Sequence, residues 1–376
     1  MKQTVRPDFT GHNIYVGMDV HKKSWTVSIF SEHHEHKTFT QPPNAQSLVG
    51  YLKRTFPGAT YNTVYEAGFC GYWIHDSLRQ QGVDSMVVNP ADVPTTDKQR
   101  RGKNDKIDSR KLGKNLRSHD LQPIYIPGSM QREDRSLLRT RYGMVRKQTR
   151  CKNQIASLLA FYGIFLPPEM ETRRWSRRFI NWLESVQFEH TSGTIALKTL
   201  IEEQLHLRKL IAGLTRQIIV LSRTYDYAEA VWLLKTIPGI STLTAMILLT
   251  EIGDISRFKN LDKLASYAGL IPDTKSSGEE EHITNITMRR NPMVRAILVE
   301  SSWVAVRKDP ALMLAFNKLC RRLKKNNAII HIARKLLNRI RFVSLLSKII
   351  AKRQFGQINR LNFHGSNSAL KSGSLI

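Results

Sequence analysis

The stretch NIYVGMDV, residues 13–20, decides how the amino-terminal part of this chain folds. It is short and rich in apolar and β-branched residues, so it predicts a strand. A second run of this kind covers residues 24–31, and a weaker third run covers residues 36–40. The segment that follows, residues 45–55, predicts a helix with Asn44 as its N-cap.

The next segments continue this alternation of strands and helices. A strand is expected to end near Glu66, a helix to cover about 72–81, and a further strand to cover 85–88. Three strands followed by helix, strand, helix and strand is the order of an RNase H-like fold. We therefore expect an α/β domain of that fold over residues 1–125.

The composition limits the class of protein. The 376 residues are too many for one ordinary core and predict two or three domains. Lys and Arg number 58 against 31 Asp and Glu, which makes the formal net charge +27, and 41% hydrophobic residues are enough to build cores. This excess of positive charge predicts a polyanionic partner, above all nucleic acid. The alternative interpretation is a solvated basic surface.

The cysteines and the hydropathy predict a soluble cytoplasmic protein. The three cysteines lie far apart in the sequence and suggest no disulfide framework. No apolar run approaches the roughly 18 residues that a membrane helix needs. The first fifteen residues lack the apolar stretch of a signal peptide.

The middle of the chain is expected to be helical. A basic stretch covers residues 98–117, a long basic helix is predicted over 129–160, and a break rich in Pro, Arg and Trp follows at about 163–185. A second long helix, from about 195 to 221, carries apolar residues in two seven-spaced series. One series is Leu200, Leu207, Leu214 and Leu221, and the other is Leu197, Gln204, Ile211 and Ile218.

This heptad pattern leaves two interpretations open with equal weight. The helix is either a coiled-coil arm that joins subunits, or one half of a helical hairpin whose other half is residues 129–160 of the same chain. A heptad repeat defines a seam and does not identify the partner. In both cases we expect a helical coiled-coil region over residues 126–228.

Two further regions are expected after this arm. Residues 229–309 predict a mainly helical domain, in which residues 233–241 resemble a helix–hairpin–helix turn around Gly239. The backbone N–H groups of such a turn can hold a phosphate, whereas the alternative is a Pro-Gly turn between buried helices. Residues 310–376 carry fourteen Lys and Arg and no acid, which predicts amphipathic basic helices followed by a loose tail over the last twenty residues.

Four acidic residues stand out in this basic chain. Asp19 lies within the first strand, Glu66 ends the fourth, and Asp105 and Asp108 begin a helix on the same side of it. The first and fourth strands are neighbours in an RNase H-like sheet, so a helix packed there would gather all four carboxylates. Such a cluster needs a cation, and oxygen ligands suit Mg²⁺ or Mn²⁺. Taken singly, each acid is a surface charge or a helix cap.

Several motifs carry a resemblance to the DEDD transposases of bacterial and archaeal insertion sequences. Three motifs resemble the RuvC-like domain of that family, namely YVGMDVHKK at 15–23, YEAG at 65–68 and NDKIDSR at 104–110. Others resemble its carboxyl-terminal transposase domain, namely IPGI at 237–240, SYAGLIP at 266–272, SSG at 276–278 and Val294-Arg295. The resemblance covers roughly residues 13–305, in the order of the family.

The resemblance implies a DNA recombinase that acts through a covalent phosphoserine. Asp19, Glu66, Asp105 and Asp108 match the metal-binding acids of the family, and Ser277 matches its nucleophilic serine. A serine hydroxyl is a weak nucleophile and needs activation. The family uses a structured RNA from its own element to pair with target and donor DNA. It assembles as tetramers, in which the RuvC-like domain of one subunit completes the serine site of another.

These implications define the expected partners and contacts. We expect Mg²⁺ or Mn²⁺ as the cofactor, DNA and a structured guide RNA as partners, a homo-oligomer (a dimer or tetramer), and association with the nucleoid. Arg289, Arg290 and Arg295 follow Ser277 and are expected either to stabilise phosphoryl charge or to contact the nucleic-acid backbone. The full set of expected nucleic-acid contacts is Arg100, Arg101, Lys103, Arg110, Lys111, Gly239, Arg289, Arg290, Arg295, Arg321, Arg322, Lys324 and Lys325.

Two departures from the family pattern lie near Ser277, and two other functions compete with recombination. The acidic triplet 279–281 follows Ser277-Gly278, and Arg290 stands before Asn291 where the family tends to have Gly. One competing function is a RuvC-like nuclease that hydrolyses junctions with the four acids alone. The other is a non-catalytic nucleic-acid-binding protein, which needs neither the acids nor the serine.

Overall fold

The computed structural model describes residues 8–95, 104–171, 174–277, 280–286 and 290–346. The chain divides into two compact units, Met1–Pro127 and Gly128–Ile376. The finer division expected within the second unit, at residues 229 and 310, stays a prediction. The expected loose tail lies outside the described residues.

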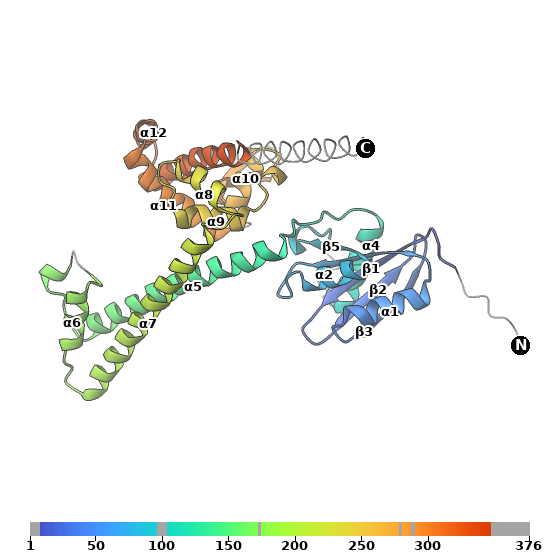
Figure 1. The fold of residues 1–376 in the computed structure, drawn as a ribbon, viewed down its shortest axis with the longest axis horizontal. Helices are drawn as coiled ribbons and strands as arrows, with labels where there is room; N and C mark the ends of the chain where they lie inside the picture. The colour runs from blue at the N-terminus through green and yellow to red at the C-terminus, as the bar shows by residue number, and fades with distance from the viewer. Residues whose placement is uncertain (1–7, 96–103, 172–173, 278–279, 287–289, 347–376) are drawn as a thin grey trace, which may run out of the picture. The chain divides into compact units, whose positions relative to one another are not determined.

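A five-stranded sheet forms the centre of the first unit (Figure 1). Its order is β3-β2-β1-β4-β5; β1 pairs antiparallel with β2 and parallel with β4, and β4 pairs parallel with β5. The strands are β1 (Asn13–Val20), β2 (Trp25–Phe30), β3 (Glu35–Gln41), β4 (Thr60–Glu66) and β5 (Asp84–Val88). The predicted strands are therefore present in the predicted order, and the first and fourth are neighbours.

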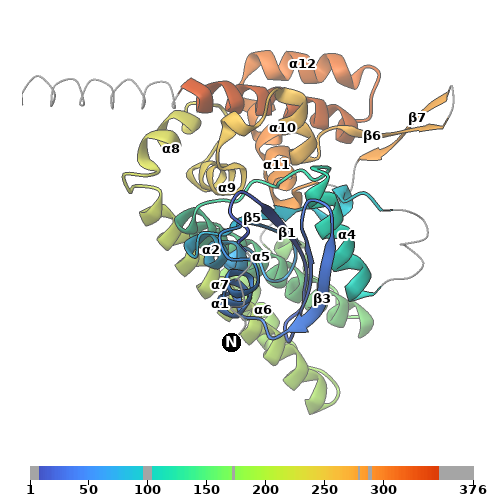
Figure 2. The same cartoon turned by 90° about the vertical axis from the view of Figure 1, so that its right-hand side faces the viewer.

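Helices cover the two faces of this sheet. On one face α1 (Ala45–Thr55) and α2 (Trp73–Gln80) share a core with the alternate β1 residues Ile14, Val16 and Met18. As predicted, Asn44 caps α1, and its side chain accepts a hydrogen bond from the amide of Ser47. The opposite face carries α4 (Asp105–Arg117) (Figure 2). A short 3-10 helix, Pro90–Asp92, follows β5.

A helical hairpin begins the second unit. The predicted long helices are α5 (Ser129–Phe161) and α7 (Thr191–Leu221), and they run side by side (Figure 1). The expected break between them is partly wrong, because it contains the 3-10 helix Pro168–Met170 and the helix α6 (Arg177–Ser185). Ser176 caps α6, and the apolar side of α6 packs into a core shared with α5 and α7.

The heptad residues of α7 face α5 of the same chain. Leu197 and Leu207 are buried in the core that α7 shares with α5 and α6, Gln204 is buried, and Leu200 is half-buried. Ile218 is buried in the core of the later helices, together with Leu138 of α5. The intramolecular alternative therefore accounts for this seam. Whether subunits also meet through the arm stays a prediction.

The remaining helices pack around one core. They are α8 (Ala228–Lys235), α9 (Thr242–Ile252), the 3-10 helix Ile255–Arg257, α10 (Leu261–Ala268), α11 (Pro292–Lys308), α12 (Pro310–Cys320) and a helical segment over 325–346. A two-stranded hairpin, β6 (Pro272–Ser277) and β7 (Glu280–Ile286), extends away between α10 and α11 (Figure 2). The same core buries Leu312, Ile332 and Leu336, so residues 310–340 are an integral part of it.

The described residues include no helix with the length and apolarity needed to cross a membrane.

Candidate functional site

Two of the four acids lie at the carboxyl ends of adjacent parallel strands. Met18 of β1 pairs with Tyr65 of β4, and the residues that follow them are Asp19 and Glu66. Side chains alternate along a strand, so Asp19 lies on the sheet face opposite to Met18, which is the face that α4 covers. The parallel register therefore brings Asp19 and Glu66 to one edge of the sheet on one face.

The other two acids come from the first turn of α4. Asn104 caps this helix, with its side chain accepting a hydrogen bond from the amide of Lys106, and Asp105 and Asp108 follow directly. Carboxylates are favourable at a helix amino terminus because of the dipole of the helix. A buried hydrogen bond of 2.8 Å between the hydroxyls of Ser28 and Ser109 fixes α4 against β2.

Two glycines allow α4 to lie directly against β1. A Cβ atom at Gly17 would lie 2.1 Å from the carbonyl oxygen of Ser109 and 2.2 Å from the amide nitrogen of Gly113. A Cβ atom at Gly113 would lie 2.4 Å from the ring of Phe30. Only residues without a side chain fit at these two positions. This close packing brings the first turn of α4 to the ends of β1 and β4.

The resulting cluster has a donor set that fits a divalent cation. Single ligand atoms of Asp19, His21 and Asp105 all lie within 4.8 Å of one another. The Nε2 atom of His21 lies 3.4 Å from Asp19 and 3.6 Å from Asp105. The two carboxylates are ligands that suit Mg²⁺ or Mn²⁺, whereas an imidazole is more typical of later transition metals. The sequence assigns His21 no role, because it stands in no recognisable metal-ligand spacing.

Electrostatics within the cluster are unfavourable for ionised carboxylates. Burial raises the pKa of the Asp19 carboxyl; His21 opposes this shift, while the negative charges of Asp105, Asp108 and Glu66 add to it. A bound cation would relieve this repulsion.

Lys111 occupies the other half of the cluster. Its Nζ atom lies 3.3 Å from Asp108 and 3.7 Å from Glu66, and only 9% of its side chain is exposed. The sequence predicts that Lys111 contacts nucleic acid; in the structure its ammonium group bridges two of the four acids. The sequence does contain a signal for this ion pair, because Lys111 lies three residues after Asp108 and side chains at that spacing are neighbours on a helix.

The expected nucleophile lies in the second unit. Ser277 is the last residue of β6 and pairs with Glu280, the first residue of β7. Strands flank this position on both sides, so the Ser-Ser-Gly motif lies at the end of a hairpin. The side chain of Ser277 lies outside what the structure describes.

A buried carboxylate secures the base of this hairpin. Glu251 of α9 is fully buried and receives two hydrogen bonds from Arg139 of α5, of 2.7 and 2.9 Å, and one from the Asn291 amide, of 2.7 Å. Asn291 also caps α11, and its backbone amide donates to the carbonyl of Tyr267, at the end of α10. Glu251 therefore joins α5 to the point where the chain enters and leaves the hairpin.

The expected nucleic-acid contacts have different environments. Arg110 pairs with Glu35 at 2.7 Å, Arg295 donates to the carbonyl of Gly269, and Gly239 packs against the backbone of Ser301. Burial lowers the pKa of the Arg295 guanidinium. The others are placed as follows: Arg290 lies over Gly269; Arg321, Arg322, Lys324 and Lys325 are exposed; and Arg100, Arg101, Lys103 and Arg289 lie outside the described residues. Contact with nucleic acid stays a prediction for all of them.

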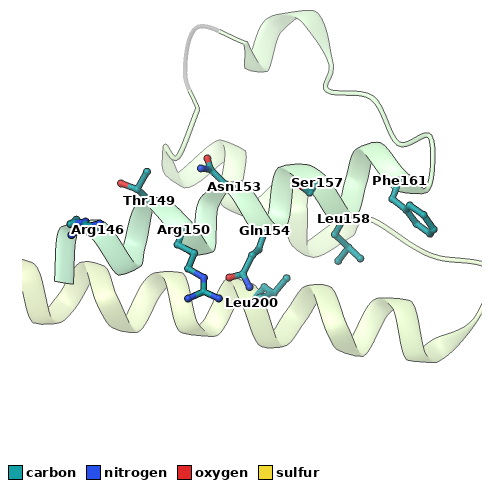
Figure 3. Close-up of a pocket in the computed structure, with 9 residues that line it drawn as sticks. All are labelled: Arg146, Thr149, Arg150, Asn153, Gln154, Ser157, Leu158, Phe161 and Leu200. Atoms are coloured by element: carbon teal, nitrogen blue, oxygen red, sulfur yellow. The ribbon is translucent and has the colours of Figure 1, made fainter. Parts of the chain in front are cut away.

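A groove also runs between α5 and α7 (Figure 3). Its volume is about 710 Å³, and its lining includes Arg146, Arg150, Asn153 and Gln154 of α5 and Leu200 of α7. Figure 3 shows Arg150 and Gln154 pointing toward α7. The two arginines make this groove moderately basic.

The models of two protein families match the chain. One match lies mainly in the first unit, and the other lies in the second. A DEDD transposase family of IS110 matches residues 16–164, which include all four acids, His21 and Lys111. The transposase family of IS116, IS110 and IS902 matches residues 231–317, which include Glu251 and Ser277. The fold and the acid cluster, read with these matches, point to the class of DEDD transposases.

Individual relatives agree with this class. The candidate transposase y4qE of Sinorhizobium fredii is 29% identical over 64% of this chain and 57% of its own length. The candidate transposase y4rJ of the same organism is 27% identical over 86% of this chain and 90% of its own length. The transposase for insertion sequence element IS1111A of Coxiella burnetii is 24% identical over 71% of this chain and 73% of its own length. The matches lie in both units and make the chain similar to insertion-sequence transposases of the IS110 family.

Proposed function

We propose that this protein is a DNA recombinase of an insertion sequence that cuts and rejoins DNA through a phosphoserine intermediate. The observation that carries the proposal is the convergence of Asp19, Glu66, Asp105 and Asp108 at one edge of the sheet, although they come from three elements of the first unit. The order and pairing of the strands support an RNase H-like fold of the RuvC type for this unit.

The acid cluster would hold a divalent cation. Asp19, Asp105 and His21 have ligand atoms at a suitable mutual spacing, and Glu66 and Asp108 lie beside them. When bound, Mg²⁺ or Mn²⁺ would supply Lewis-acid stabilisation of phosphoryl charge. The protein's own part is to hold these carboxylates close together, and Lys111 reduces the net negative charge at Glu66 and Asp108.

Ser277 would supply the nucleophile. Its hydroxyl oxygen would form a bond to a DNA phosphorus while the bond from phosphorus to the leaving deoxyribose oxygen breaks, and the serine proton would pass to that oxygen. The covalent link conserves a phosphodiester, so that a second DNA hydroxyl can reverse the step without an external energy source. Glu251 and Asn291 attach the base of the hairpin that carries Ser277 to α9 and α5.

Partners and assembly follow from the family. DNA binding accords with the net charge of +27. We propose that a structured RNA of the element selects the DNA, and that subunits assemble as dimers or tetramers, so that acids and serine of different subunits complete one site. Holding two duplexes requires more than one subunit.

The test is to trap the covalent intermediate. Labelled donor and target DNA, with the transcript of the element ends, are incubated with the protein and Mg²⁺, denatured, and examined for label that migrates with protein. We expect an adduct with the wild type and with Ser276→Ala, and none with Ser277→Ala or Asp19→Asn.

The competing functions predict different outcomes. Cleaved DNA without an adduct in both wild type and Ser277→Ala would favour a hydrolytic nuclease that uses the acids alone. An adduct that disappears in Ser276→Ala but persists in Ser277→Ala would move the nucleophile by one residue. Binding without cleavage in all variants would favour a non-catalytic nucleic-acid-binding protein.

A further inference from the structure

A hollow in the second unit gathers positive charge from two helices. Its volume is about 870 Å³, and it lies between the end of α12, the helical segment 325–346 and α10. All the titratable residues that line it are basic, namely Lys318, Arg321, Arg322, His331, Arg334 and Lys335. We call this region the basic hollow.

The helical segment 325–346 is held in one rotational position. Ile332, Leu336 and Ile340 are buried in the core of the unit. His331, Arg334 and Lys335 come from the other side of the helix, because their spacing repeats at three and four residues. Arg334 is further fixed by an ion pair with Asp262 of α10. The basic side chains therefore line the hollow as a consequence of core packing.

The basic hollow has an apolar floor as well as a basic rim. Leu261, Ala315 and Leu319 line it and are half-buried, whereas Lys318 and Arg322 are exposed. Asn338, one turn beyond Lys335, adds an amide that can both donate and accept hydrogen bonds. A rim of cations suits phosphates, and an apolar floor beside an amide suits the flat face and polar edge of a nucleobase.

The shape distinguishes this region from a general duplex-binding surface. A duplex presents its phosphates to a protein and keeps its bases stacked inside, so it cannot fill an apolar hollow beneath a basic rim. The groove between α5 and α7 contributes only two arginines among its lining residues and suits contact with a backbone. The basic hollow combines both parts of a nucleotide site.

We propose that the basic hollow binds an unpaired nucleotide of a single-stranded nucleic-acid segment, with its base on the apolar floor and its phosphates at the rim. This proposal rests on the proposed function only in taking nucleic acid as the ligand. It needs neither the acid cluster nor Ser277.

The experiment measures binding of the full chain to a short fluorescent oligonucleotide as single-stranded RNA, as single-stranded DNA of the same sequence, and as a blunt DNA duplex. Ala315→Phe fills the floor without changing the charge. We expect it to weaken binding of single strands by about 5-fold, the lower end of what the loss of one stacked base produces, because this floor is aliphatic and not aromatic. Duplex binding and the salt dependence should not change. The single strand whose binding is weakened (RNA, DNA or both) identifies the source of the nucleotide.

Two further variants complete the test. Lys335→Ala should reduce the slope of log K against log salt for single strands by about 0.7 for each phosphate that the protein no longer neutralises. Lys308→Ala removes the same charge from an exposed position of α11 outside the lining of the hollow, and should change that slope less. Asn338→Leu removes the amide that would bond to the polar edge of the base, and provides a second measurement if Ala315→Phe unfolds the protein.

Unchanged single-strand affinity in folded Ala315→Phe, or equal weakening for single strands and duplex, would overturn the proposal. The covalent-adduct experiment with Ser277→Ala is independent of this result, because it reports on the hairpin. If the protein forms the adduct and Ala315→Phe leaves the single-strand affinity unchanged, only the proposed nucleotide site is contradicted. A protein that shows the expected binding but no adduct would contradict only the phosphoserine mechanism.

Discussion

Replacing Gly17 with alanine is expected to displace α4 and to dismantle the acid cluster without removing any acid. The added Cβ would lie 2.1 Å from the Ser109 carbonyl oxygen and 2.2 Å from the Gly113 amide nitrogen. An ordinary contact between carbon and oxygen is about 3.3 to 3.6 Å. Both atoms belong to the backbone of α4, so no side chain can rotate away and the helix must retreat by about 1 Å.

This displacement predicts two separate effects. Overpacking of this kind costs about 1–3 kcal/mol, which in a unit of this size lowers the melting temperature by several degrees. A shift of about 1 Å between catalytic groups lowers a reaction rate by about 100-fold. Asp105 and Asp108 move with α4 while Asp19 and Glu66 stay with the sheet, so binding of Mn²⁺ should weaken as well.

Calorimetry, Mn²⁺ titration and the adduct assay measure these effects. Gly50→Ala is the matched control, because Gly50 lies within α1 of the same unit and its new Cβ would have only the flexible end of Arg54 nearby, at 3.7 Å. Alanine is favoured over glycine in a helix by about 1 kcal/mol, so this control should be slightly more stable than the wild type and fully active. A Gly17→Ala protein with wild-type stability and Mn²⁺ affinity would refute the packing argument.

Two further predictions concern buried charges. Asp19→Asn should melt at a higher temperature than the wild type at neutral pH without metal, because burial raises the pKa of Asp19 and the ionised form opposes folding. This advantage should disappear as the pH falls below about 4, where the carboxyl is protonated in the folded and in the unfolded state. Mg²⁺ should raise the melting temperature of the wild type only. An equal rise for the wild type and Asp19→Asn would contradict the metal site. In urea unfolding, Arg139→Gln should cost about 1–3 kcal/mol, because the buried Glu251 carboxylate loses two hydrogen bonds and keeps Asn291 and, at 3.9 Å, Arg135 as partners; Glu251→Gln should cost less. The reverse order would show that Glu251 does not depend on Arg139.

The local pattern of the sequence was sufficient for most of the first unit. Alternating apolar runs bounded by turns predicted its strands, and a capping residue, Asn44, predicted the start of α1. These signals are local, because a strand or a helix needs only its own residues to show the period of its buried side. The helix α6 was missed because it has only nine residues and lies in a stretch rich in Pro, Arg and Trp, and it is held by the core it shares with α5 and α7.

The heptads of α7 show that a local sequence pattern does not determine which helix is the partner of an apolar seam. Leu197 and Leu207 define an apolar seam in the sequence, yet a seam on α5 of the same chain and a seam on another subunit would produce the same repeat. Only the packing of α7 on α5 within the chain distinguishes the two for these residues.

For the candidate site too, some features are visible in the sequence and others depend on tertiary packing. The sequence by itself singled out the candidate acids, since Asp19, Glu66, Asp105 and Asp108 are out of place in a strand or in a basic stretch and therefore visible. Tertiary structure alone decided what surrounds them: Gly17 and Gly113 let α4 meet β1, and His21 and Lys111 each lie against two of the acids. The physical reason is that the cost of burying a carboxylate is evident at its own position, whereas its partners are decided by how elements distant in the sequence pack together.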